Sequence, residues 1–160
     1  MEAGKYIGAA TGLLTGATTC PINQYCPPGS SAPIDCPTGT GTVSTGMGEL
    51  LNCGPCPAGT ACPTAGTSVA CSAGYYCPAG TKNPTDYPCP PGTFTSSTAA
   101  TASSDCTDCP TGKACAEAST VGTLDCAAGH YCPLRTEYPT QFPCPAGTYS
   151  ANINNAASTD

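Results

Sequence analysis

The segments that decide the fold are CSAGYYC at residues 71–77 and CAAGHYC at residues 126–132, which share terminal cysteines and a central glycine. Related segments surround them. CPAGTAC at 56–62 matches CPTGKAC at 109–115, and CPPGTF from Cys89 matches CPAGTY from Cys144. Aligned in this way, the cysteines are spaced C-x5-C-x9-C-x16-C-x2-C-x5-C from Cys20 onward, and nearly the same spacing starts again at Cys71. The chain therefore repeats with a period of 51 to 55 residues.

This register divides the chain into four parts. We predict a degenerate half-repeat at 1–19, cysteine-rich repeats at 20–70 and 71–125, and a partial repeat at 126–160. In the half-repeat, Met1 and Ile7 stand where the other copies have cysteine. The same spacing places the cysteine that follows Cys144 at position 161.

The composition excludes an ordinary hydrophobic core. Leu, Ile, Val and Phe together number 15 of 160 residues, and there is no Trp, whereas there are 15 cysteines. Burial stabilises a fold mainly through large apolar side chains, so cross-links must oppose the chain entropy here. With 19 glycines and 18 prolines as turn signals, we expect small disulfide-rich repeats. They should be elongated and mostly loops, with short β-hairpins near 74–77, 93–96 and 129–132 and one helical turn near Ile7–Leu14.

The cysteines favour disulfides over a metal site. Zinc needs Cys or His in compact groups of four. The close pairs Cys53/Cys56 and Cys106/Cys109 lie about 50 residues apart, and there is one histidine. Disulfides persist in oxidising compartments, so we expect an extracellular or cell-surface protein.

Charge and hydropathy exclude two classes of partner. Four Lys and Arg against ten Asp and Glu leave no basic patch for nucleic acid or for an anionic membrane. No run of 18 apolar residues exists, so no membrane span is expected. The stretch Ile7–Leu14 resembles the apolar part of a signal peptide, but Gly8, Thr11 and Gly12 interrupt it. We interpret it as part of the fold, with any signal sequence outside this numbering.

The candidate catalytic and metal-binding residues do not indicate an enzyme or a cofactor. The single His130 aligns with Gln24 and Tyr75, so the position does not require an imidazole. Cys144 has no histidine near it to activate a thiolate. Asp105 and Asp108 could suggest calcium, yet the preceding repeat has Asn52 and Pro55 there, and a solvated turn is the simpler interpretation.

The chain resembles the ephrin-receptor-like cysteine-rich repeat in four features. These are the start C-P-x-G-T-aromatic, the long Ser/Thr loop, the C-x2-C and the C-P-x-G-x-x-C. That repeat is similar in layout to the cysteine-rich modules of tumour-necrosis-factor receptors. The resemblance covers the chain from about Cys20 onward. It implies a module type and not one function, because such repeats occur in receptors, matrix proteins and surface proteins of protists and algae.

The resemblance also implies a disulfide pairing. One bridge closes each C-x16-C loop, and the next four cysteines interlock first to third and second to fourth. Cys20 and Cys26, whose partners would fall at positions 1 and 7, are then expected to pair with each other. Cys144 is left unpaired or intermolecular. The implied bridges are Cys20–Cys26, Cys36–Cys53, Cys56–Cys71, Cys62–Cys77, Cys89–Cys106, Cys109–Cys126 and Cys115–Cys132.

The C-x16-C loops are rich in hydroxyl side chains and almost free of charge, which favours O-linked glycans; hydrated loops without sugar remain the alternative. The one Asn-x-Thr sequence is blocked by Pro84. The candidate O-glycosylation sites are Thr38, Thr40, Thr42, Thr45, Thr93, Thr95, Ser96, Ser97, Thr98, Thr101, Thr148 and Ser150.

We predict a structural protein: a subunit or segment of an extracellular filament or surface appendage that self-assembles head to tail as a glycoprotein. A second copy placed about three residues beyond Asp160 would continue the repeat, and such heterologous contacts generate fibres. One alternative is a ligand-binding module of a receptor or secreted protein, which would show aromatic and Arg anchors. Another is a protist surface-coat protein without ordered assembly.

Overall fold

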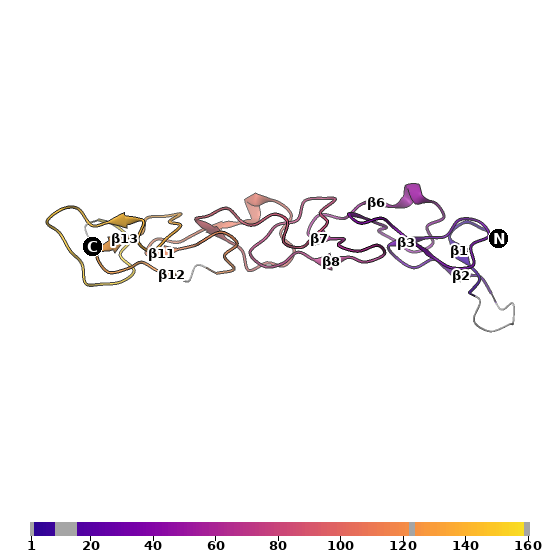
Figure 1. The fold of residues 1–160 in the computed structure, drawn as a ribbon, viewed down its shortest axis with the longest axis horizontal. Coiled ribbons are helices and arrows are strands. Elements are labelled where there is room, and N and C mark those ends of the chain that lie inside the picture. Colours follow the sequence, from indigo (N-terminus) through magenta and orange to yellow (C-terminus); the bar gives the residue numbers. More distant parts are fainter. Residues whose placement is uncertain (1, 9–15, 122–123, 159–160) are drawn as a thin grey trace. The chain divides into compact units, whose positions relative to one another are not determined.

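The computed structural model describes residues 2–8, 16–121 and 124–158, which are nearly all loop, turn and very short strand (Figure 1). The predicted class of small disulfide-rich repeats with short hairpins is therefore confirmed. The chain forms two compact units: Met1–Cys71 with Cys77–Asp86, and Ser72–Tyr76 with Tyr87–Asp160. Most of the helical turn expected near Ile7–Leu14 lies outside the described residues.

Each strand has two residues, and the strands form seven antiparallel pairs. The pairs are β1 (Lys5–Tyr6) with β2 (Thr18–Thr19), β3 (Gln24–Tyr25) with β4 (Ile34–Asp35), β5 (Thr40–Gly41) with β6 (Gly54–Pro55), β7 (Thr60–Ala61) with β8 (Val69–Ala70), β9 (Thr93–Phe94) with β10 (Thr107–Asp108), β11 (Lys113–Ala114) with β12 (Leu124–Asp125), and β13 (His130–Tyr131) with β14 (Phe142–Pro143). Two single-turn 3-10 helices, η1 (Leu50–Asn52) and η2 (Ser103–Asp105), were not predicted. An isolated antiparallel β-bridge between Tyr75 and Pro88 occupies the place of an eighth strand pair.

The recurring element is one hairpin, shorter than the predicted 51-to-55-residue period. Each hairpin opens with a seven-residue segment, here called the opening heptapeptide, whose first residue is Cys and whose fourth is Gly or Asn. Its fifth and sixth residues pair with the two residues before the next heptapeptide. The cysteine-led heptapeptides are 20–26, 36–42, 56–62, 71–77, 89–95, 109–115, 126–132 and 144–150, and residues 1–7 form a version without cysteine.

A tight turn at the centre of each heptapeptide reverses the chain. In the heptapeptide 36–42, the Thr40 amide donates to the Pro37 carbonyl oxygen at 3.0 Å, and the Thr40 hydroxyl donates to the same oxygen at 2.6 Å. Gly39 has φ of 78°. A positive φ at the third position defines a type II turn and favours glycine there. Proline at the first position supplies the carbonyl acceptor, so the Cys-Pro-x-Gly-Thr sequence specifies the turn.

Cystines fill the interior in place of large apolar side chains. Among the described residues, the buried apolar side chains are thirteen cysteines and three alanines, Ala61, Ala100 and Ala114. No Leu, Ile, Val or Phe that the structure describes is buried; Leu51 is 91% exposed. Aromatic rings pair across two of the hairpins, with ring centroids 5.7 Å apart for Tyr76–Tyr87 and 5.6 Å for Tyr131–Phe142.

The structure contains seven disulfides, and three of them are those that the family resemblance implies. These are Cys20–Cys26, Cys36–Cys53 and Cys89–Cys106, and Cys144 is free. The four interlocked pairings are wrong in the structure: Cys56–Cys71, Cys62–Cys77, Cys109–Cys126 and Cys115–Cys132 are replaced by Cys56–Cys62, Cys71–Cys77, Cys109–Cys115 and Cys126–Cys132.

The heptapeptide turn is the physical reason for this correction. By reversing the chain, it brings the Cα atoms of Cys109 and Cys115 to 5.8 Å, inside the range that a disulfide spans. Where the seventh residue is threonine, as in Thr42 and Thr95, the first cysteine has no partner within its heptapeptide and bridges 17 residues ahead. The residue at the seventh position thus selects between the two kinds of bridge.

Peptide mapping without reduction distinguishes the two pairings. After alkylation of free thiols, cleavage before aspartate separates peptide 108–124, with Cys109 and Cys115, from peptide 125–159, with Cys126 and Cys132. We expect the two peptides to be released separately, with 108–124 lighter by two hydrogens than its reduced form. Peptide 86–104 should stay linked to 105–107 through Cys89–Cys106, which serves as the internal control. Recovery of 108–124 joined to 125–159 would contradict the observed pairing.

Candidate functional site

The most regular feature of the chain is the backbone contact between consecutive hairpins. In the second compact unit, the Gly92 amide donates to the Cys115 carbonyl oxygen at 2.8 Å, and the Cys109 amide donates to the Gly92 carbonyl oxygen at 2.9 Å. The fourth residue of one heptapeptide, here called the turn residue, is therefore held at both polar groups by the next heptapeptide. Because the donors and acceptors are backbone groups, this contact depends little on side-chain identity.

The contact recurs at eight consecutive turn residues. Their carbonyl oxygens all accept from the first amide of the next heptapeptide, and seven of their amides donate to the seventh carbonyl of that heptapeptide; the Asn23 amide donates to the Thr42 hydroxyl instead. The eight turn residues are Gly4, Asn23, Gly39, Gly59, Gly74, Gly92, Gly112 and Gly129. The ninth, Gly147, has neither group hydrogen-bonded within the described part of the chain.

A second contact reaches two hairpins ahead and explains why several turn residues are glycine. The Arg135 carbonyl oxygen lies so close to Gly92 that a Cβ atom there would overlap it, and Ala118 lies against Gly74 in the same way. A Cβ on Gly112 would be 2.5 Å from the Asn154 carbonyl oxygen. Ala118, Arg135 and Asn154 themselves have positive φ, which aims their carbonyls at the glycines. At Gly74, Gly92 and Gly112, position four thus requires glycine for both its conformation and its space.

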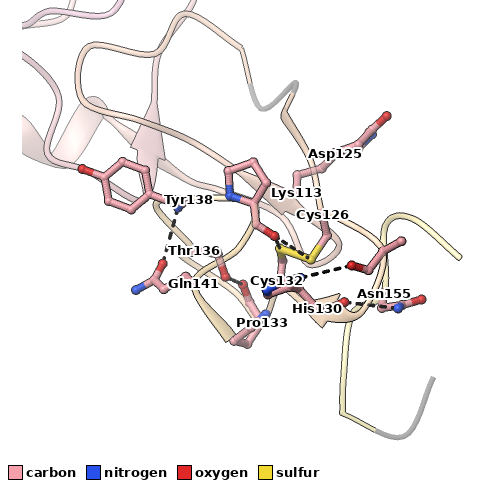
Figure 2. Close-up of a disulfide and its surroundings, with 12 residues drawn as sticks. Lys113, Asp125, Cys126, His130, Cys132, Pro133, Thr136, Tyr138, Gln141 and Asn155 are labelled. Atoms are coloured by element: carbon pink, nitrogen blue, oxygen red, sulfur yellow. Dashed lines mark hydrogen bonds and ion pairs between the residues drawn. A yellow bond between two sulfur atoms is a disulfide. The ribbon is translucent and has the colours of Figure 1, made fainter. Parts of the chain in front are cut away.

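Figure 2 shows the surroundings of the Cys126–Cys132 bridge in the second compact unit. The Pro139 carbonyl oxygen lies 3.6 Å from the Cys126 sulfur, and Pro84 makes the matching approach to Cys71 at 3.7 Å in the first unit. The buried Thr136 hydroxyl donates to the Pro133 carbonyl oxygen at 2.6 Å. The side-chain amide of Asn155 donates to the His130 carbonyl oxygen at 3.2 Å. Polar groups therefore enclose the bridge with their hydrogen bonds satisfied.

The predicted glycan sites separate into two groups. Thr42, Thr93 and Thr95 are 2%, 4% and 5% exposed, so as native-state acceptors these three predictions are wrong. Their hydroxyls serve the fold: Thr93 donates to the Pro90 carbonyl oxygen at 2.6 Å, and Thr42 accepts from the Asn23 amide at 2.7 Å. An enzyme cannot glycosylate such hydroxyls unless the hairpin opens.

The remaining candidates differ in how far their hydroxyls are engaged. Four are exposed and make no hydrogen bond within the described residues: Thr38, Thr45, Ser96 and Thr98. Ser97 is also exposed and accepts from the Ala99 amide at 3.2 Å. The hydroxyls of Thr40, Thr101, Thr148 and Ser150 are engaged as donors within their own loops. Loop 93–104 thus presents three adjacent accessible hydroxyls.

Asp105 closes the second C-x16-C loop. Its Oδ2 accepts from the Thr101 amide at 2.7 Å, the Thr101 hydroxyl at 3.0 Å and the Ala102 amide at 3.2 Å. These hydrogen bonds, the Thr101 amide first, lower the carboxyl pKa from its usual 3.8. Asn52 replaces it in the first loop and accepts from the Glu49 amide at 2.9 Å. Asp105 is thus engaged in a loop cap, which accounts for the pattern that suggested calcium.

The lowered pKa of Asp105 predicts a pH-dependent loop. Because the folded-state pKa lies below the unfolded value, the carboxylate stabilises the loop above about pH 4. This contribution is lost as the pH falls through the folded pKa. We expect the Thr101 amide shift to follow that titration in NMR spectra. Asp105→Asn, which copies Asn52, should keep an acceptor and abolish the titration; an unchanged Thr101 titration in this variant would contradict the assignment.

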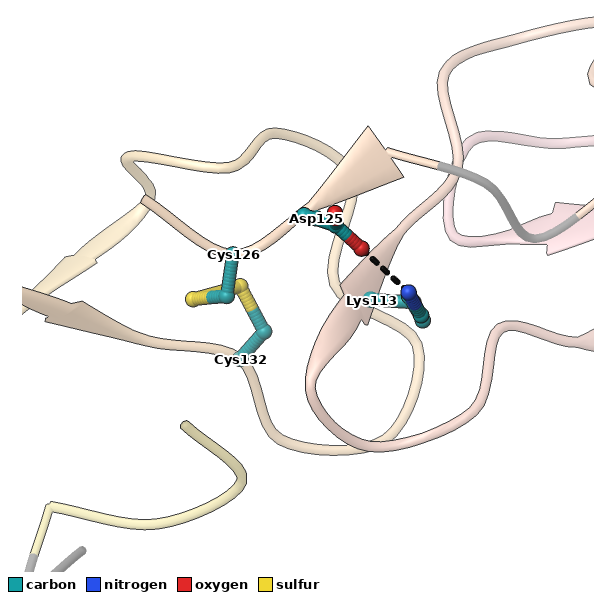
Figure 3. Close-up of polar contacts among 4 residues, drawn as sticks. All are labelled: Lys113, Asp125, Cys126 and Cys132. Carbon is teal, nitrogen blue, oxygen red and sulfur yellow. Dashed lines mark hydrogen bonds and ion pairs between the residues drawn. A yellow bond between two sulfur atoms is a disulfide. The ribbon is translucent and has the colours of Figure 1, made fainter. Parts of the chain in front are cut away.

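Figure 3 shows the ion pair between Lys113 and Asp125, which face each other across β11 and β12 near the Cys126–Cys132 bridge. Arg135 and Asp108 form a second pair at 3.2 Å. Both pairs are substantially exposed, so each stabilises little. His130 places its Nδ1 3.1 Å from the Ala128 carbonyl oxygen. Within the described ranges, no cluster of three or more His, Cys, Asp or Glu is arranged to hold a metal ion.

The fold defines a cysteine-rich, disulfide-bonded repeat protein, and its seven disulfides indicate a secreted or extracellular protein. None of the helices in the described ranges has the length and apolar character needed to cross a membrane. Compared with known proteins, the chain matches no protein-family model and no curated protein sequence.

Proposed function

We propose that the chain is a structural component of an extracellular filament or surface appendage, assembled head to tail from copies of itself. The observation that carries this proposal is the self-similar backbone contact at eight consecutive turn residues. In repeat arrays each unit contacts its neighbours through the same kind of interface, so a contact between two copies can take the same form. A contact of this heterologous kind extends a polymer without closing it.

The side chains support a scaffold role. Cystines preserve the shape of the seven hairpins from Cys20 to Pro143, and the contacts between hairpins are backbone hydrogen bonds. Most side chains are therefore free to face solvent and are small. This arrangement suits a load-carrying or spacing element more than a site that must hold a few reactive groups in a fixed geometry.

A glycan coat is the second part of the proposal. Thr38, Thr45, Ser96, Ser97 and Thr98 offer accessible hydroxyls on loops that contain almost no charge. Sugars there would keep a polymer of weakly charged chains hydrated. Electron-transfer fragmentation of the native protein should find hexose or other glycan mass on these five residues and none on Thr42, Thr93 or Thr95. If these loops carry no sugar, the proposed glycan coat is wrong, whereas the proposed assembly is unaffected.

Assembly is tested directly on the oxidised chain, residues 1–160. We expect purified protein to form linear polymers above a critical concentration, visible by negative-stain electron microscopy and by sedimentation. The same protein denatured in urea with its disulfides intact is the control, since covalent aggregates would survive that treatment. A strictly monomeric species at all concentrations would overturn the proposed function.

A binding role has one observation in its favour. The loop closed by Cys36–Cys53 exposes Val43 at 81% and Leu51 at 91%, whereas the equivalent positions in the next copy are Ser96 and Ser104. Exposed apolar residues whose equivalents in the next copy are serine are candidates for a contact with another protein. Replacing Val43 and Leu51 by serine should abolish co-purification of such a partner from native material, and an unchanged partner set would exclude this role.

A further inference from the structure

One bridged cysteine differs from all the others in its exposure. Cys53, which closes the loop that begins at Cys36, is partly exposed, whereas every other bridged cysteine is buried. Cys106 closes the equivalent loop from Cys89 and is 8% exposed. These loops are here called the first loop (36–53) and the second loop (89–106). A thiol opens a disulfide only where it reaches a sulfur atom, so the first loop has the more accessible bridge.

The strand pairs that follow the two closing cysteines account for the difference in exposure. In the first loop, β5 and β6 pair Gly41 with Gly54, so neither residue contributes a side chain beside the bridge. In the second loop, β9 and β10 pair Phe94 with Thr107 at the same two positions. The closing cysteine of the first loop therefore lacks the side chains that stand beside its counterpart.

Charge distinguishes the two bridges in the same direction. Asp105 directly precedes the closing cysteine of the second loop, and Asn52 holds that position in the first loop. Asp108 also follows the second bridge, although its ion pair with Arg135 at 3.2 Å reduces its effect. In the first loop the nearest preceding carboxylate, Glu49, lies further along the chain from the closing cysteine. Since a thiolate is repelled by carboxylates, it approaches the first bridge more readily than the second.

The first loop is also held by contacts other than its bridge. The Gly46 amide donates to the Cys20 carbonyl oxygen at 2.8 Å, and the Cys26 amide donates to the Met47 carbonyl oxygen at 2.8 Å. These two hydrogen bonds fix the loop on the preceding heptapeptide, whose own bridge is buried. Opening the bridge of the first loop therefore leaves the loop attached to a folded neighbour.

We propose that Cys53 is a thiol-modification site, at which a small extracellular thiol opens the Cys36–Cys53 bridge and forms a mixed disulfide. The thiolate sulfur attacks Cys53 Sγ, so that a new S–S bond forms and the bond to Cys36 Sγ breaks. The electron pair of the broken bond leaves with Cys36, which takes up the proton that the incoming thiol lost. One disulfide is exchanged for another, so the step needs no further oxidant or reductant. This inference is independent of the proposed assembly.

Timed alkylation tests the proposal on the oxidised chain. The Cys144 thiol is first blocked with iodoacetamide. The protein is then incubated with glutathione at neutral pH, quenched with N-ethylmaleimide at intervals, and mapped by peptide fragmentation. The first product should carry glutathione on Cys53 and maleimide on Cys36, and the Cys89–Cys106 bridge should open at least about tenfold more slowly. Equal rates for the two bridges, or earlier opening of any other bridge, would overturn the proposal.

Two substitutions that copy the second loop are the matched variants. Gly54→Thr copies Thr107; Gly54 has no positive φ, and an added Cβ there meets no described atom within 4 Å. Asn52→Asp copies Asp105 and keeps an acceptor for the Glu49 amide. Each variant should open its first-loop bridge about threefold more slowly or less readily still, with the second bridge unchanged, and added salt should restore the rate of Asn52→Asp.

Thermal unfolding of the oxidised variants checks that both fold like the wild type. If both are folded and neither slows the opening of the first-loop bridge, the partly exposed cysteine is not the point of attack and the proposal is wrong. Because the readout is the order in which bridges open, the result is the same whether or not the chain assembles, and a failure here leaves the proposed function standing.

Discussion

Complete reduction of the seven disulfides is expected to unfold the chain at room temperature. The described interior contains cystine sulfur and three alanines and no large aliphatic side chain, so the reduced chain has little apolar area to bury. Chain-entropy arguments assign about 2 kcal/mol to a bridge of six-residue separation and about 3 kcal/mol to one of 17 residues. These contributions are comparable in sum to the whole stability of an ordinary domain.

The measurement is amide dispersion in NMR spectra at neutral pH before and after treatment with a phosphine reductant. Single-bridge variants give the graded control. Cys36→Ser with Cys53→Ser should lower the unfolding temperature more than Cys20→Ser with Cys26→Ser, because the first pair closes the longer loop. Native-like dispersion in the fully reduced chain would show that something other than sulfur holds the hairpins.

Gly92→Ala is expected to be among the most damaging single substitutions outside the cysteines. Alanine at φ of 79° costs about 1 kcal/mol by itself. The larger effect is the overlap of the new Cβ with the Arg135 carbonyl oxygen, which is backbone and cannot rotate away. The hairpins on both sides must separate to relieve it, and we expect a loss of several kcal/mol.

Gly29→Ala separates the strain of a positive φ from the overlap of the new Cβ. Gly29 also has a positive φ, but an added Cβ there meets no atom within 4 Å. Thermal unfolding of both oxidised variants should show a fall of a few degrees for Gly29→Ala and a much larger fall for Gly92→Ala. Equal falls in the two variants would mean that the close approach to Arg135 contributes nothing.

The cysteine pattern was sufficient to predict the class of fold, and the family resemblance implied the two long bridges correctly. Cys36 and Cys89 each have a partner 17 residues ahead, and no cysteine at the seventh position competes for them. Four of the five bridges within heptapeptides were missed because the family resemblance implied an interlocked order; Cys20–Cys26 was predicted. The local signal was present in Cys-Pro-Ala-Gly-Thr-Ala-Cys, where proline, glycine and threonine specify a reversing turn.

The true period was hidden by the alternation at the seventh position. Cys62, Cys77 and Thr95 occupy equivalent places, so cysteine spacing alone repeats only every three hairpins. The turn glycine recurs in every hairpin except the one with Asn23, and it would have revealed the shorter period. Burial of Thr42 and Thr95 could not be predicted from hydroxyl content, because it depends on contacts with neighbouring hairpins.

The placement of the bridges has a mechanical consequence. Each disulfide closes a ring within its own hairpin, and none of them joins one hairpin to the next. Under a pulling force, hydrogen bonds between hairpins can break one after another while the rings stay shut. Opening the rings chemically would release roughly 180 Å of additional contour length from one chain. The molecule would thus behave as an extensible tether whose maximum reach is set by the redox state of its surroundings.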